Sequence, residues 1–364
     1  MNENLYCVIM AGGAGHRFWP ISREDKPTQF LKIHPEEKTL LRITWERFAA
    51  IVPKDNILVV TLDKYADLVR DQIPEMKPEN LLLEPYSRGT APCMTYAAAT
   101  LLKRNPQAVM VATPSDHIIR DDFLFTRTID DSVRYVEEND VLMTIGIVPK
   151  NADVNFGYIQ VREGKGAYLS DKPLKVKTFT EKPDEQLAKV FFRTGEFFWN
   201  SGVFIWKAST IMQEMERYIP EVTTMFAGLE NVLGTPGERE FMVRAYGDCP
   251  KVSLDYGVME RTDKAWLFPA KFGWTDIGSW EALYRIVPEK DGARNAVNTN
   301  LRLFEDCTDS IVLSSRKNKL LAVKGLKDYI IVDTPDALLI CPKDEKEFRD
   351  FISGIGMPEY EPYR

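Results

Sequence analysis

An apolar run that passes directly into a glycine-rich turn opens the chain and constrains its fold most strongly. Residues 6–10 (YCVIM) are followed by Gly12, Gly13 and Gly15, and then by Arg17. The short apolar run predicts a buried strand. Because glycine has no Cβ, backbone N–H groups of the turn can approach a ligand closely and form a nest for phosphate oxygens. Arg17 adds a rigid positive fork, so the stretch predicts a nucleotide-phosphate loop.

Strands and helices alternate over the next hundred residues. The predicted elements are helix 40–51, strand 57–61, helix 65–73, strand 81–83, helix 91–103 and strand 109–112. This βαβαβαβ order predicts an α/β fold with a Rossmann-like, mostly parallel mixed sheet that carries helices on both faces. Ligands bind beyond the carboxyl ends of the strands in such sheets. The loops that follow the strands are therefore the places to look for a site.

Two of these loops carry polar groups suited to a nucleotide. The loop over residues 84–92 has donors and acceptors that could read a nucleobase, although a capped helix start with Thr90 or Ser87 as the cap explains the loop alone better. The next loop places Asp116 at a strand end, where a carboxylate either holds a hard cation against phosphates or caps the following turn. Asp276 also follows an apparent strand and precedes a helix. Two aspartates at neighbouring strand ends could share one Mg²⁺.

Polar residues set among aromatic ones mark the middle of the chain. The predicted elements there are strands 141–147, 156–161, 176–183 and 199–206, with a helix at 185–194. A sugar needs aromatic faces for its C–H surface and polar side chains for its hydroxyls. Most of the aromatic residues are explained by an ordinary core. Glu181, Lys182 and Asn200 are harder to place in a core, and this favours a polyol site.

The bulk composition excludes several classes of protein. With 47 basic and 54 acidic residues the net charge is -7, which argues against a broad nucleic-acid surface. No apolar stretch approaches the roughly 20 residues that span a bilayer, and the amino terminus has no secretory pattern. The five cysteines show no paired spacing, which favours a reducing compartment. We therefore expect a cytoplasmic protein with no nucleic-acid or membrane partner.

The sequence loosens after residue 288, and this predicts a domain boundary there. We expect a first domain over residues 1–288 and a small β-rich domain over residues 289–364. Four short apolar strands, at 310–313, 319–323, 329–333 and 337–341, are separated by tight turns and predict a partial β-helix. Such units cap poorly alone. The small domain is thus expected to pack on the first domain or on a second copy, as in a homodimer.

Motifs along nearly the whole chain resemble the mannose-1-phosphate guanylyltransferases (GDP-mannose pyrophosphorylases) in their short, monofunctional form. The matching stretches are residues 11–22, 29–31, 84–92, 114–117, 156–159, 181–183, 199–202, 255–260 and 274–280. The resemblance implies a Mg²⁺-assisted transfer of GMP from GTP to α-D-mannose 1-phosphate, giving GDP-mannose and pyrophosphate. The sugar phosphate would attack the α-phosphorus in line, with no covalent intermediate. Its oxygen is already an anion, so the protein must supply alignment and charge neutralisation rather than a base.

The resemblance also implies roles for residues of the matching motifs. The nucleotide would be bound by Ala11, Gly12, Gly13 and Gly15, with Arg88 and Thr90 at the guanine. The catalytic residues would be Arg17 at the leaving pyrophosphate, Lys182 at the sugar phosphate, and Lys26. The sugar hydroxyls would meet Gly157, Glu181 and Asn200, and Asp116 and Asp276 would hold Mg²⁺.

Two departures from the family pattern keep other functions open. The family usually has Lys directly before Gln29, where this chain has Thr28; Lys26 is the candidate to replace that charge. It usually has Asn where Gly89 stands, which weakens the assignment of guanine. The alternatives are a pyrophosphorylase for another sugar 1-phosphate or nucleotide, and a weakly active GDP-mannose-sensing subunit. A dehydrogenase is disfavoured because Phe18 stands where a dinucleotide fingerprint needs its third small residue.

Overall fold

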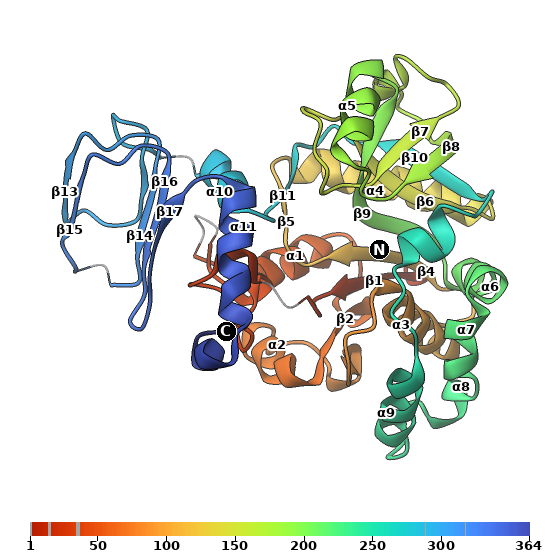
Figure 1. Ribbon diagram of the computed structural model, residues 1–364. Helices are drawn as coiled ribbons and strands as arrows, with labels where there is room; N and C mark the ends of the chain where they lie inside the picture. Colours follow the sequence, from red (N-terminus) through yellow and green to blue (C-terminus); the bar gives the residue numbers. More distant parts are fainter. Residues whose placement is uncertain (1, 14–15, 34–36, 288, 317) are drawn as a thin grey trace. The chain divides into compact units, whose positions relative to one another are not determined.

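The computed structural model describes residues 2–13, 16–33, 37–287, 289–316 and 318–364 (Figure 1). The chain forms two compact units built from interleaved segments. The first comprises Met1–Gly12, Thr44–Ser115 and Ile119–Trp274, and the second comprises Gly13–Ile43, Asp116–Ile118 and Thr275–Arg364. The division at residue 288 stays a prediction about domain organisation. Gly15 of the predicted nucleotide loop lies outside the described residues.

A nine-stranded mixed sheet forms the centre of the first unit, in the order β3-β2-β1-β4-β9-β6-β10-β8-β7. The strands are β1 (Leu5–Met10), β2 (Ile57–Leu62), β3 (Leu81–Glu84), β4 (Val109–Pro114), β6 (Leu142–Ile147), β7 (Tyr158–Val161), β8 (Leu174–Thr180), β9 (Phe197–Lys207) and β10 (Ala265–Pro269). The first four strands of that order are parallel. Beyond them β9 runs antiparallel to both β4 and β6, so the parallel character predicted for most of the sheet is confined to β3-β2-β1-β4 and the β6–β10 pair.

Helices cover both faces of this sheet, which confirms the predicted α/β fold. They are α1 (Leu40–Ala49), α2 (Ala66–Gln72), α3 (Thr90–Arg104), α4 (Asp122–Glu138), α5 (Glu185–Thr194), α6 (Ala208–Tyr218), α7 (Pro220–Thr223), α8 (Leu229–Val232) and α9 (Glu238–Asp248). On one face Val8 and Met110 share a core cluster with Ala97 of α3. Cys7 and Ile9 point to the opposite face and are fully buried as well.

One long helix and the helices over residues 208–248 were not predicted from the sequence. Helix α4 buries Phe125, Ile129, Val133 and Val136, which follow a helical spacing. Asp121 caps this helix, because its carboxylate accepts a hydrogen bond from Leu124 N–H at 2.9 Å. The signals of an amphipathic helix and an N-cap were therefore present in the sequence.

The second unit contains a small parallel β-structure, as predicted for a partial β-helix. Its strands are β12 (Ala296–Val297), β13 (Arg302–Glu305), β14 (Ile311–Ser314), β15 (Leu321–Lys324), β16 (Tyr329–Asp333) and β17 (Leu338–Pro342). Two sheets form, β12-β14-β16-β17 and β13-β15, and Figure 1 shows them side by side. Their pairs are parallel except β16–β17. Asn295 joins successive turns, since its side chain bonds Cys307 O at 2.8 Å and Ser310 N–H at 3.0 Å.

The core of the second unit joins the β-structure to segments from much earlier in the chain. Phe18 and Trp19 of the loop after β1 lie in one cluster with Trp280 of α10 (Trp280–Ile286) and Phe348 of α11 (Glu345–Ser353). Trp19 Nε1 donates a hydrogen bond to Tyr363 O at 2.7 Å. The residues after the glycine turn are thus held by the same core that supports the β-structure.

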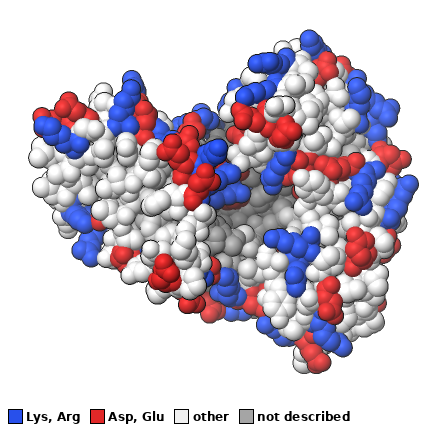
Figure 2. Space-filling model, in the orientation of Figure 1, with Lys and Arg blue, Asp and Glu red and all other residues white. Residues whose placement is uncertain are grey.

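The distribution of surface charge and the state of the cysteines agree with the composition. On the face in Figure 2, basic and acidic side chains are interspersed. All five cysteines are buried free thiols. None of the helices in the described part of the chain combines the length and the apolar character needed to cross a membrane.

Candidate functional site

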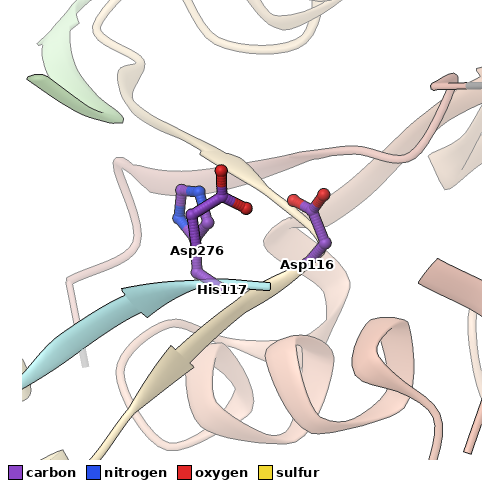
Figure 3. Close-up of side chains that lie close together, drawn as sticks. All are labelled: Asp116, His117 and Asp276. Carbon is purple, nitrogen blue, oxygen red and sulfur yellow. The ribbon is translucent and has the colours of Figure 1, made fainter. Parts of the chain in front are cut away.

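Two aspartates and a histidine come together in the second unit (Figure 3). Asp116 directly precedes β5 (His117–Ile119), and Asp276 is the last residue of β11 (Trp274–Asp276), the strand that pairs with β5. One ligand atom from each of Asp116, His117 and Asp276 lies within 4.8 Å of the others. The positions of the two aspartates at strand ends predicted that they could share a cation. His117 was not predicted to join them, because three scattered histidines form no ligand spacing.

The donors of this cluster fit a hard cation. Mg²⁺ is usually bound by one or two carboxylates, several waters and the phosphates of a substrate. Asp116 and Asp276 offer that pair of carboxylates, and both are partly accessible. Imidazole nitrogen is a ligand better suited to transition metals. We therefore take the two aspartates as the pair that fits Mg²⁺, with the buried His117 beside them.

Arg17 lies next to Asp276. Its Nη1 is 3.7 Å from Asp276 Oδ2, and the side chains are 55% and 19% exposed respectively. A Cβ on Gly278 would lie 2.7 Å from Arg17 Nη1 and 3.0 Å from Asp276 Oδ2. Because position 278 is a glycine, the Arg17 guanidinium and the Asp276 carboxylate can approach each other here. An exposed guanidinium at this distance is free to turn toward a polyanionic ligand.

The segment that carries Arg17 is fixed by its neighbours in the second unit. Phe18 N–H donates to Ser22 Oγ at 3.0 Å, and the Phe18 ring packs edge-on against Trp280 with centroids 5.1 Å apart. Gln29 Nε2 donates to Gly13 O at 3.0 Å. Buried Gln29 thus holds the second glycine of the turn, which gives a physical reason for the motif that contains it.

Thr28 stands where the family usually has lysine, and Lys26 is the candidate to replace that charge. The two residues differ sharply in exposure. Thr28 is buried at 3% exposure, in a short 3₁₀ turn over Thr28–Phe30. Lys26 is exposed, and its backbone closes a turn with Arg23 through hydrogen bonds of 3.1 and 3.2 Å. The role of Lys26 at a phosphate stays a prediction.

The residues that the sequence predicted to bind a sugar lie close together in the first unit. Asn200 N–H donates to Gly157 O at 2.8 Å. A Cβ on Gly157 would lie only 2.5 Å from Glu181 Oε2, so the absence of a side chain at 157 lets Glu181 reach this position. Lys182 Nζ is 3.1 Å from Glu181 Oε1, with the lysine 59% exposed and the glutamate side chain 10% exposed.

An irregularity in β9 presents Asn200. The β6–β9 register shifts between Thr144↔Phe204 and Gly146↔Asn200, and Gly202 takes a φ of 72° within the extra residues. Such bulges re-aim a side chain. The Asn200 Oδ1 then accepts hydrogen bonds from Thr144 Oγ1 at 3.0 Å and from Gly202 N–H at 3.2 Å.

Asp255, for which the sequence predicted no role, completes this cluster. It accepts a hydrogen bond from Asn200 Nδ2 at 2.9 Å and begins a π-helical turn over Asp255–Met259, a feature that is frequent at functional sites. Burial and the negative charge of Glu181 raise the pKa of Asp255 to about 7. Asp255 thus fixes the orientation of the Asn200 amide. Its signal in the sequence was its place in the matching stretch 255–260.

Replacing Asp255 by Asn is expected to make the protein's stability less sensitive to pH. A carboxyl whose folded-state pKa is raised adds stability at low pH, and that stability is lost as pH rises toward the folded-state pKa of about 7. Asp255→Asn should therefore raise the thermal midpoint more at pH 8 than at pH 5, by several degrees. Scanning calorimetry at the two pH values measures the difference.

The matched control for this experiment is Asp71→Asn, which changes an exposed carboxylate on α2. It should shift both midpoints equally. Equal shifts for Asp255→Asn as well would show that its carboxyl does not change protonation between these pH values.

The loop predicted to read a base is bonded to residues 246–254. Arg88 donates from Nε to Tyr246 O at 2.9 Å and from Nη2 to Gly247 O at 3.0 Å. Thr90 Oγ1 accepts from Leu254 N–H at 2.8 Å. Both side chains therefore have a structural role in this conformation. Their contact with guanine stays a prediction.

Two family models match the chain. The one described as "Nucleotidyl transferase" matches residues 6–291. The one described as "MannoseP isomerase/GMP-like beta-helix domain" matches residues 306–347. The first spans most of the chain, and the second spans β14 to β17.

Similar proteins match over nearly the full length of this chain. The mannose-1-phosphate guanylyltransferase RfbM of Salmonella typhimurium is 32% identical over 98% of this chain and 74% of its own length. The xanthan biosynthesis protein XanB of Xanthomonas campestris pv. campestris is 33% identical over 96% of this chain and 72% of its own. A crystal structure from Thermus thermophilus, described as a mannose-1-phosphate geranyltransferase, matches with a TM-score of 0.84 at 29% identity and covers 97% of this chain and 100% of that one.

Proposed function

The chain belongs to the nucleotidyl transferase family, and from this premise we propose that it transfers GMP from GTP to α-D-mannose 1-phosphate, giving GDP-mannose and pyrophosphate. Sugar-phosphate nucleotidyl transfer agrees with the relatives; the choice of GTP, mannose and Mg²⁺ is our proposal. The observation that carries it is the meeting of Asp116, Asp276 and Arg17 in one unit. Two carboxylates beside a guanidinium suit a triphosphate that arrives with a divalent cation.

The site would have to neutralise the charge of the phosphates and align the attacking oxygen with the α-phosphorus. Asp116 and Asp276 would hold Mg²⁺, which when bound would offset the negative charge of the phosphates. Arg17 would bind the pyrophosphate as it leaves, since a guanidinium matches the geometry of phosphate oxygens. Gly12 and Gly13 would offer backbone N–H groups to the phosphates. No residue has to act as a base, because the attacking phosphate oxygen is already ionised.

The sugar phosphate would be held by the cluster in the first unit. Glu181 and Asn200 present a carboxylate and an amide beside Gly157, a combination that suits adjacent sugar hydroxyls. Lys182 is more than half exposed beside Glu181 and would meet the phosphate. Asp255 would keep the Asn200 amide in one orientation through their hydrogen bond. This arrangement would fix the sugar before the in-line attack.

A panel of substrates tests the proposal. Pyrophosphate release is measured with GTP, ATP, UTP and dTTP against mannose 1-phosphate and glucose 1-phosphate in the presence of Mg²⁺. We expect the highest kcat/KM with GTP and mannose 1-phosphate. A preference for UTP or dTTP would contradict the nucleotide assignment. Tight binding of GDP-mannose without pyrophosphate release would instead favour a sensing subunit.

A further inference from the structure

The side chain of Arg23 joins three segments of the second unit that are far apart in the sequence. Its Nε donates a hydrogen bond to Pro20 O at 2.8 Å, within its own loop. Its Nη1 donates to Tyr363 O at 2.7 Å, in the 3₁₀ helix Pro358–Tyr363. Its Nη2 donates to Asp336 Oδ1 at 3.0 Å, in the turn between β16 and β17. A guanidinium can bond all three acceptors because its five N–H donors point in fixed directions.

Trp19 makes this junction more rigid. Trp19 Nε1 donates to the same Tyr363 O at 2.7 Å, and the Arg23 guanidinium lies 5.6 Å from the centre of the Trp19 ring, within the range of a cation–π attraction. The Arg23 side chain is only 14% exposed, and Trp19 is buried in the core that contains residues of β14, β16 and β17. The loop is therefore fixed to the β-structure at this point.

Arg17, in the same loop, depends on that fixed point for its position. Its side chain is 55% exposed, and its nearest charged partner, Asp276, lies 3.7 Å away, so these contacts hold it loosely. The backbone that carries it leads into the junction through a tight turn, in which Phe18 O accepts a hydrogen bond from Ser22 N–H at 3.0 Å. A displacement of Arg23 would pass through this turn to Arg17.

We propose that Arg23 is a positioning residue, which fixes the loop so that the Arg17 guanidinium meets the departing pyrophosphate. The proposal rests on the function proposed above, because it needs a pyrophosphate at Arg17. The β-structure then contributes to catalysis without touching a substrate, since it anchors the loop through Asp336. Placement of this kind matters, because a misplacement of about 1 Å that originates far from the reacting atoms can cost on the order of 100-fold in rate.

A purely structural role for Arg23 has different consequences. In that case removing its side chain lowers the thermal midpoint, but the folded protein keeps its kcat at temperatures well below the midpoint. A positioning role instead lowers the kcat of the folded protein, and the loss depends on the presence of Arg17. The two roles are therefore separated by kinetics on variants that circular dichroism shows to be folded.

Arg23→Ala, measured alone and together with Arg17→Ala, tests the proposal. We expect kcat for pyrophosphate release to fall about 10- to 100-fold, with KM for mannose 1-phosphate within about twofold of the parent. In the Arg17→Ala background the same change should cost no more than about threefold, because no guanidinium is left to misplace. Losses that multiply in the double variant would overturn the proposal, and so would an unchanged kcat in folded Arg23→Ala.

A second variant breaks the junction from the side of the β-structure. Asp336 is 51% exposed, so Asp336→Ala is expected to fold as the parent does. It should lower kcat about 3- to 10-fold, again only where Arg17 is present. Arg23→Lys should recover little of the activity, because one ammonium nitrogen cannot bond three acceptors in different directions. Full activity in both variants would contradict the role of the junction.

The matched control is Arg294→Ala, which removes another arginine–aspartate pair of the second unit. Arg294 donates from Nε and from Nη2 to Asp309, at 2.6 Å in each case. This variant should keep the kcat of the parent, and a loss as large as that of Arg23→Ala would overturn the specific role of Arg23. A parent protein that releases no pyrophosphate would overturn the proposed function itself. An active parent whose kcat survives Arg23→Ala would overturn the positioning role alone.

Discussion

Asp276→Asn is expected to lower kcat for pyrophosphate release at least ~1,000-fold while leaving the thermal midpoint close to that of the parent. The loss follows from removing one of two carboxylates that fit a divalent cation, since charge stabilisation by a bound metal contributes several kcal/mol in such reactions. The fold should survive, because Ser279 rather than Asp276 caps α10 by accepting from Ala282 N–H at 3.1 Å. Turnover as a function of Mg²⁺ concentration is the measurement.

Two further variants make this prediction specific. Asp116→Asn should produce a loss of the same order, because its carboxylate is the other member of the pair. Asp350→Asn, which changes an exposed carboxylate on α11, should retain the parent's rate. If Asp276→Asn keeps both the rate and the Mg²⁺ dependence of the parent, Asp276 has no part in the chemistry.

Arg17→Ala is expected to lower kcat/KM on the order of 100-fold or more, about 3 kcal/mol of transition-state stabilisation. The exposed guanidinium lies 3.7 Å from Asp276, in space that Gly278 leaves open, where it can meet the charge that develops on departing pyrophosphate. Initial rates of pyrophosphate release over a range of GTP concentrations separate the effect on kcat from that on KM.

Arg17→Lys should restore part of the activity, because it keeps the charge but loses the two-pronged geometry. The control is Arg285→Ala, at an exposed position on α10 where the arginine pairs with Glu281. It should behave as the parent does. Unchanged kinetics in Arg17→Ala would remove this residue from the site.

The sequence alone predicted the α/β fold and the pairing of Asp116 with Asp276. Both inferences use rules that act locally or through topology: hydrophobic periodicity predicts strands and helices, and ligand-binding side chains are common where strands end. In the structure the two aspartates meet where β5 pairs with β11, outside the nine-stranded sheet. Glycines in the turn after β1, and polar residues among aromatic ones near Glu181 and Asn200, were also visible without coordinates. The residues themselves indicated a phosphate-binding turn and a polyol site, and a resemblance to a family gave each residue its particular role, so these roles remain proposals.

The tertiary structure alone decided which of several polar residues meet in and around the site. Arg23 and Asp336 are 313 residues apart in the chain, and Asn200 and Asp255 are 55 apart. No periodic pattern links such positions, because their contact depends on sheet order, on the β9 bulge and on side-chain burial. Arg88 illustrates the converse, since a positive charge in a predicted ligand loop is bonded to two backbone carbonyls. A sequence pattern limits where ligands bind, but burial and hydrogen bonding determine which side chains are available to them.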